Sequence, residues 1–99
     1  MGFNVQTLIR AELEIDEIVF YYENIQNGLG NRFLSDYENM LDTLESYPFF
    51  EQKYNIMRQL PFKKFPYTIH FQVDEFENIV YIESITCDYL NPASTRIKF

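Results

Sequence analysis

The chain of 99 residues is long enough for one hydrophobic core, and we expect a single domain over residues 1–99. Hydrophobic residues make up 46% of the sequence and aromatic residues 18%, a composition that excludes an intrinsically disordered protein. The net charge of −7 argues against binding nucleic acid over the whole surface, because phosphates repel an acidic protein.

The single cysteine, Cys87, has no partner for an internal disulfide, as is usual for a protein of a reducing compartment. No apolar run follows a basic segment near the N-terminus, so we expect no secretion signal. No stretch approaches the ~18 consecutive apolar residues of a membrane span. We therefore expect a soluble, cytoplasmic protein.

Two helices are predicted in the first half of the chain, after a short strand over residues 3–7. Apolar residues recur at helical spacing over residues 9–26, and again up to Pro48, which ends the second helix. Gly30 or Asn31 is the expected cap of the second helix. The short link between the helices predicts a helical hairpin. The two apolar stripes comprise Ala11, Ile15, Ile18, Val19, Tyr22 and Ile25, and then Phe33, Tyr37, Met40, Leu41, Leu44 and Tyr47.

The second half of the chain is typical of consecutive antiparallel strands. One strand is predicted over residues 54–60. The next is predicted to begin at Pro66, and over residues 67–74 apolar and polar residues alternate with the period of two that a half-buried strand shows. A polar turn over residues 74–78 leads into a last strand over residues 79–85, rich in branched and aromatic residues. The pattern predicts a small α+β domain in which both helices bury their stripes against the sheet.

Charge is unevenly distributed along the chain. Between residues 11 and 51 every charged residue is acidic except Arg32, whereas between residues 52 and 73 every one is basic. A guanidinium at Arg58, on a strand close to two lysines, is suited to binding a phosphate or a carboxylate. Ion pairs with helix carboxylates, or simple solvation of a turn, are equally compatible with the pattern. The basic residues of this stretch are Lys53, Arg58, Lys63 and Lys64.

Other candidate reactive groups are few. His70 falls on the face of its strand opposite Tyr67, and histidine suits proton transfer near neutral pH, although a surface or half-buried structural role is the alternative. Cys87 is expected to fill space, because Asp88 beside it disfavours a thiolate. One histidine and one cysteine make no metal set, and no phosphate-binding loop or helical zinc motif occurs. We expect neither a metal nor a cofactor.

A set of short segments in a fixed order points to a known family. The segments are Tyr21-Tyr22-Glu23, Gly28-Leu29-Gly30 followed by Arg32-Phe33, Tyr47-Pro48, Arg58 with Leu60, Phe65-Pro66-Tyr67, and Asn91-Pro92. With them the chain resembles the RelE/ParE toxin superfamily, the plasmid-stabilisation proteins of bacterial type II toxin–antitoxin pairs, over nearly its whole length. The GLGxRF and FPY segments lean toward the ParE branch. The resemblance implies the order β-α-α-β-β-β, with the helical hairpin packed on one face of a small, mainly antiparallel twisted sheet.

The resemblance also implies a function. The ParE branch poisons DNA gyrase and the RelE branch cleaves messenger RNA on the ribosome, and an antitoxin neutralises both. We expect a ParE-like toxin without enzyme activity, whose partner contacts include Arg58, Lys63, Lys64 and Tyr67. The alternatives are a RelE-like ribonuclease that uses Arg58, Lys63, Lys64 and His70, and a degenerate member that retains only antitoxin binding.

The sequence departs from the family pattern at two positions. Cys87 and Leu90 stand where many relatives carry a histidine and an arginine. Loss of the arginine weakens both RNA binding and stabilisation of the developing charge, which disfavours the ribonuclease interpretation. The acidic surface predicts an antitoxin segment that is rich in Lys and Arg, and an exposed edge strand of the sheet is suited to forming a homodimer.

Overall fold

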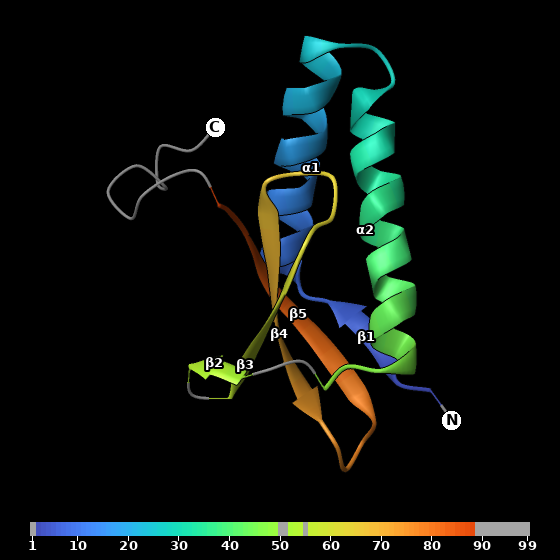
Figure 1. Ribbon diagram of the computed structural model, residues 1–99, viewed down its shortest axis with the longest axis vertical. Coiled ribbons are helices and arrows are strands. Elements are labelled where there is room, and N and C mark those ends of the chain that lie inside the picture. Colours follow the sequence, from blue (N-terminus) through green and yellow to red (C-terminus); the bar gives the residue numbers. More distant parts are fainter. Residues whose placement is uncertain (1, 50–51, 55, 89–99) are drawn as a thin grey trace.

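The fold is seen in a computed structural model, which describes residues 2–49, 52–54 and 56–88. Two antiparallel helices lie along a twisted sheet (Figure 1). This arrangement confirms the predicted α+β class and the helical hairpin on a mainly antiparallel sheet. The elements are β1 (Asn4–Thr7), α1 (Ile9–Ile25), α2 (Leu29–Ser46), β2 (Gln52–Tyr54), β3 (Met57–Pro61), β4 (Tyr67–Asp74) and β5 (Ile79–Cys87).

The five strands form one sheet in the order β1-β5-β4-β3-β2. The strands β2 to β5 pair antiparallel with their neighbours, whereas β1 pairs parallel with β5. The helical hairpin therefore carries the chain from the β1 edge of the sheet to the opposite edge, and the later strands return step by step to β1.

The prediction of a single strand over residues 54–60 holds for residues 57–60, which lie in β3, but is wrong for Tyr54, which belongs to β2. The chain instead turns back on itself, so that β2 and β3 pair with Tyr54 opposite Met57. Neither glycine nor proline stands between these two residues, and a single asparagine, Asn55, is only a weak indication of a turn. The last strand also runs two residues beyond the predicted end, to Cys87.

A β-bulge interrupts β5 near the middle of the sheet. His70 lies opposite Ser84, but the next residue, Phe71, lies opposite Ile82, so Glu83 has no counterpart on β4. An extra residue reverses which side chains face the core. Before the bulge the buried residues of β5 are the even-numbered Val80 and Ile82. After the bulge the buried residue is the odd-numbered Ile85.

The C-terminal end of β1 and the N-terminal part of α1 close the sheet beside this bulge. Pairing of β1 stops where Thr7 lies opposite Ile82. Beyond it the backbone N–H of Ile85 donates to Glu14 Oε1 at 2.7 Å, so a helix side chain replaces the missing strand partner. The hydroxyl groups of Thr7 and Tyr37 are 2.6 Å apart, which joins the end of β1 to α2.

A cluster of aromatic rings forms the centre of the core between the hairpin and the sheet. Phe33 is fully buried, with its ring stacked on Phe62 at a centroid distance of 4.9 Å and edge-on to Tyr67 at 5.6 Å. Ile25 and Tyr47 were expected in the apolar stripes but are exposed, because each lies at the C-terminal end of its helix. The other buried apolar residues are Ala11, Ile15, Ile18, Tyr37, Met40, Leu44, Ile69, Phe71, Val80, Ile82 and Ile85.

The link between the helices is capped from α1. The second helix starts at Leu29, with Gly28 as its N-cap at φ 89°, so the predicted cap at Gly30 or Asn31 is wrong. The carboxylate of Glu23 accepts hydrogen bonds from the backbone N–H groups of Gly28 at 2.9 Å and Gly30 at 3.0 Å. A negative charge at this position also complements the positive end of the α2 dipole.

Candidate partner-binding site

Tyr67 lies in the core and not on the surface. It is 2% exposed, and its ring packs against Tyr22, Phe33 and Phe62. Burial raises the pKa of its hydroxyl group above the usual range. A partner therefore cannot contact this side chain in the folded protein, and its contribution to any site is to hold the neighbouring chain in place.

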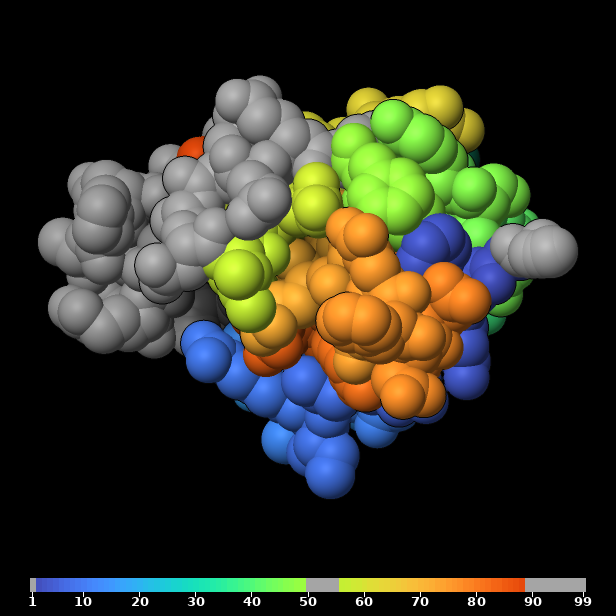
Figure 2. Space-filling model, turned by 90° about the horizontal axis from the view of Figure 1, so that it is seen from below, coloured from blue at the N-terminus to red at the C-terminus, as the bar shows by residue number. Residues whose placement is uncertain are grey.

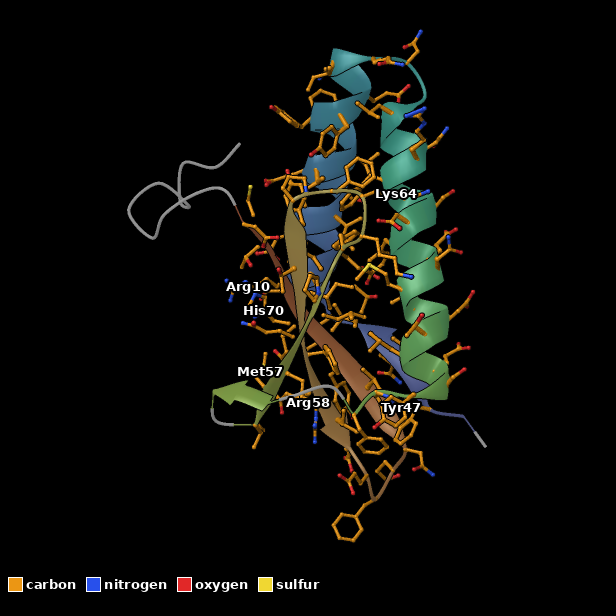
Figure 3. All side chains as sticks on the ribbon, in the orientation of Figure 1. Arg10, Tyr47, Met57, Arg58, Lys64 and His70 are labelled. Atoms are coloured by element: carbon orange, nitrogen blue, oxygen red, sulfur yellow. The ribbon has the colours of Figure 1, made fainter. Side chains whose placement is uncertain are left out.

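Arg58 lies near the start of β3, at the end of the sheet where the β4–β5 turn is found (Figure 3). Its guanidinium carbon is 5.7 Å from the centroid of the Phe49 ring, within the range of a cation–π interaction. Phe49 also meets Phe3 and Tyr47 edge-on, with centroids 5.5 and 5.6 Å apart. We call these four residues the Arg58 cluster. Tyr47 is 58% exposed, so the cluster offers a partner both a cation and an aromatic surface.

Figure 2 views the molecule from below, the end near which Figure 3 places Arg58 and Tyr47. Seen from below, the green end of α2 borders the blue N-terminal segment on one side and the orange β4–β5 region on the other. The tip of the β4–β5 turn projects from this end, with Phe76 98% exposed. Asp74 Oδ1 holds the turn by accepting hydrogen bonds from the N–H groups of Phe76 and Glu77.

The two lysines lie apart from Arg58. Lys63 and Lys64 are exposed in the connection between β3 and β4, and Figure 3 shows Lys64 beside α2, well separated from Arg58. About five residues of extended chain, or ~16 Å, separate Arg58 from the lysines. The structure therefore does not gather the three predicted cations into one cluster.

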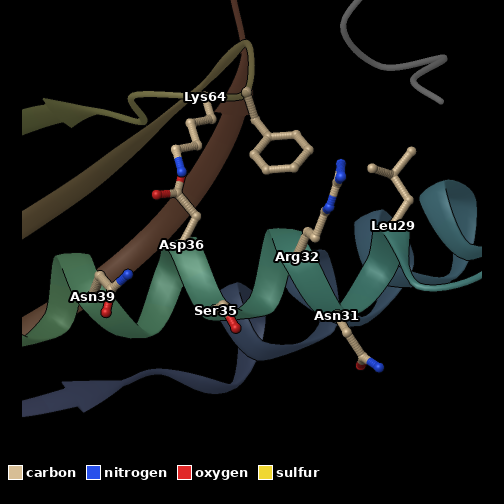
Figure 4. A pocket seen from close by; sticks show the side chains of 8 residues that line it. Leu29, Asn31, Arg32, Ser35, Asp36, Asn39 and Lys64 are labelled. Carbon is tan, nitrogen blue, oxygen red and sulfur yellow. The ribbon is translucent and has the colours of Figure 1, made fainter.

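Lys64 instead lines a groove of about 640 Å³ between α2 and the β3–β4 connection (Figure 4). We call it the α2 groove. Asp36 in this groove is only 9% exposed. Asp36 is not among the residues predicted from the sequence, and Arg32 was not assigned to a site, although a lone arginine in an acidic stretch is a usable indication. The lining residues are Leu29, Asn31, Arg32, Ser35, Asp36, Asn39, Lys64 and Phe65.

His70 is a buried member of a hydrogen-bonded group on the sheet. It is 7% exposed, with Nε2 2.8 Å from the Thr86 hydroxyl oxygen and Nδ1 3.4 Å from the side-chain nitrogen of Gln59. Burial lowers the pKa of the ring, against the opposing fields of Glu14 and Asp88. The neutral ring is therefore favoured, and it stands in β4 away from Lys64 (Figure 3).

Stability should fall as the pH is lowered below the ordinary titration range of histidine. An unfolded histidine titrates near pH ~6.5, whereas the pKa of folded His70 is lower, so below that pH the unfolded chain binds a proton that the folded chain does not. His70→Gln should reduce this loss, as measured by urea unfolding between pH 8 and pH 5. Because His70 is the sole histidine, the difference between the two curves isolates its titration. Parallel curves would show that its burial has no such effect.

Cys87 and Leu90 are the two positions at which the sequence departs from the family pattern. The thiol of Cys87 is partly buried at the end of β5, opposite Tyr67. Leu90, Asn91-Pro92 and the tail lie outside the described residues. Among the residues that are described, no three His, Cys, Asp or Glu side chains are placed to hold a metal ion. In the same part of the chain, neither helix has the length and apolar character needed to cross a bilayer.

Comparison with known proteins shows the fold but no close sequence relative. No protein-family model matches the sequence, and the curated proteins give no match either. Among solved structures, the chain is similar to one from the "Chromosomal ParDE TA system from P. aeruginosa", with a TM-score of 0.73 and 15% sequence identity. The match covers 84% of this chain and 92% of that chain. At this identity the likeness confirms the fold that the sequence resemblance implied.

Proposed function

We propose that the chain is the toxin of a bacterial type II toxin–antitoxin system and that a cognate antitoxin neutralises it. The observation that carries this proposal is the shared fold with a chain of a ParDE toxin–antitoxin system over 84% of the present chain. The ordered GLGxRF and FPY segments support it, because residues of the two segments contact each other in this fold. Gly28 lies in the hairpin link and Gly30 lies where the two helices meet, and the aromatic residues Phe33, Phe65 and Tyr67 pack together.

We further propose that the toxin acts by binding DNA gyrase rather than by cleaving RNA. Cleavage needs basic groups that converge on one phosphate, where they stabilise the developing charge. In this fold Arg58 and Lys64 are separated, and His70 is buried with a lowered pKa (Figure 3). The Arg58 cluster is a better candidate for a protein contact, since arginine and tyrosine are enriched at the centres of protein interfaces.

The outer face of α1 is suited to the antitoxin. Ile9, Leu13 and Phe20 are 75%, 60% and 70% exposed and repeat at helical spacing, so they form one apolar strip opposite the core. Acidic residues flank this strip. An antitoxin segment with apolar anchors between lysines and arginines would complement the surface, in agreement with the charge predicted from composition. The flanking acidic residues are Glu12, Asp16 and Glu17.

Induced expression of the protein in a bacterial host, without its neighbouring genes, should stop growth. Co-expression of the product of the adjacent open reading frame should restore it. The measurement is colony formation after induction, with soluble protein verified by immunoblot. Normal colony formation in the presence of soluble protein would contradict the proposed toxicity and favour a degenerate member that retains only antitoxin binding.

Two assays on the purified toxin test which cellular target it acts on. We expect inhibition of gyrase supercoiling and intact ribosome-bound messenger RNA. The double variant Arg58→Ala, Lys64→Ala separates the two mechanisms further. If it is as toxic as the parent, the ribonuclease alternative is wrong; if toxicity and message cleavage disappear together, the ribonuclease alternative is right.

A further inference from the structure

The α2 groove contains a buried carboxylate oxygen that lacks a hydrogen-bond donor. Asp36 is 9% exposed, and its Oδ2 finds no partner among the described residues. A buried acceptor that loses its hydrogen bonds to water without replacement destabilises the folded protein. Such an atom in a native structure calls for an explanation, and a donor supplied by a binding partner is one.

Two cations stand around this carboxylate. Arg32 precedes Asp36 by one helical turn on α2, and Lys64 extends over the groove from the β3–β4 connection (Figure 4). Neither cation lies within ion-pair distance of a carboxylate in the described part of the chain. Both side chains are exposed, so their charged groups are accessible to a ligand at the rim of the groove.

The charges define the chemistry of the occupant. With two cations at its rim and one carboxylate in its wall, the groove is locally positive on a protein of net charge −7. A carboxylate of the occupant would be held by Arg32 and Lys64, while an N–H group would satisfy Asp36 Oδ2. A DNA backbone offers an anion but no hydrogen-bond donor beside it. A polypeptide offers both groups within one or two residues.

We propose that the α2 groove binds an acidic residue of the antitoxin, with its carboxylate between Arg32 and Lys64 and an adjacent N–H group donating to Asp36 Oδ2. The identity of the partner rests on the proposed toxin function. The volume of about 640 Å³ fits a few residues of a peptide segment. The antitoxin would then combine a basic segment over α1 with an acidic residue in the α2 groove.

The decisive variant is Asp36→Asn, which keeps the shape of the side chain and removes its charge. The probe is the purified product of the adjacent open reading frame, with affinity measured by calorimetry and thermal unfolding followed on the free toxin. We expect binding to weaken at least tenfold while the melting temperature of the free toxin stays the same or rises. Asp42→Asn is the matched control, because Asp42 is an exposed carboxylate on the same helix and does not line the groove.

A second pair of variants tests the rim without touching the helix. Lys64→Glu should weaken binding at least tenfold, whereas Lys63→Glu, an equal charge change on the neighbouring exposed residue outside the groove, should have a smaller effect. A lower melting temperature with unchanged affinity for Asp36→Asn would assign Asp36 a purely structural role and overturn the proposal. Equal effects of the two lysine variants would also overturn it. If the parent toxin fails to bind the probe, the proposed function itself is wrong.

Discussion

Replacing Phe33 by alanine should lower the free energy of unfolding by about 3–5 kcal/mol, the range observed for truncation of buried aromatic side chains. The ring is fully buried and contacts Phe62, Phe65 and Tyr67 at centroid distances of 4.9, 5.2 and 5.6 Å. A domain is stabilised by only about 5–15 kcal/mol, so this single change removes a large part of the total. Urea unfolding followed by circular dichroism measures the loss directly.

Phe20→Ala is the matched control for this experiment. Phe20 is 70% exposed on α1, so the same truncation there should change stability by about 0.5 kcal/mol or less. If Phe20 instead contacts the antitoxin, the control variant should bind the antitoxin more weakly while remaining folded. Similar losses of stability for the two variants would contradict the central position of Phe33 in the core.

The segments that carry the family resemblance contribute mainly to the core. They could therefore predict the fold but not the cellular target. Phe33 from the GLGxRF segment meets Phe65 and Tyr67 from the FPY segment in the aromatic core. Residues that pack a core specify which elements come together, and they were sufficient to predict the fold. They say little about the cellular target, because the surface that meets it is formed by other residues.

The long periodic elements were predictable because each carries its own pattern. The helix predicted over residues 9–26 is observed over Ile9–Ile25, and the strand predicted to begin at Pro66 is observed over Tyr67–Asp74, the stretch with the alternating pattern. The turn between β2 and β3 was missed because no glycine or proline marks it. The bulge in β5 was missed because an extra residue is recognised only when the partner strand is known.

The candidate site was less predictable, since it depends on distances through space. Arg58 and Lys64 are close in sequence, but an extended strand carries them to different ends of the sheet. Conversely, Asp36 and Lys64 are 28 positions apart and line the same groove. Among the many acidic residues of the helices, only the packing of the β3–β4 connection against α2 distinguishes Asp36.

Gly28 in the hairpin link and Gly30 in the first turn of α2 should respond to substitution in different ways. A Cβ atom added at Gly30 would lie 2.7 Å from the carbonyl oxygen of Val19 and 3.0 Å from Glu23 Oε1, so the backbones of the two helices would have to separate. We expect Gly30→Ala to cost about 1–3 kcal/mol through this overpacking. The loss should also weaken the Glu23 cap, since its hydrogen bond to the Gly30 N–H requires the close approach.

Gly28 provides the comparison because its constraint is conformational. Its φ of 89° is unfavourable for most residues, but apart from Gly28 itself and its two chain neighbours no described residue has an atom within 4 Å of the position where a Cβ atom would stand. Gly28→Ala should therefore cost about 1–2 kcal/mol, and Gly28→Asn less, since asparagine tolerates the left-handed region. At Gly30 asparagine should be no better than alanine, because there is no room for a Cβ atom at that position. Thermal unfolding of the four variants tests this reasoning, and a recovery of stability in Gly30→Asn relative to Gly30→Ala would show that the helices are not held together at this contact.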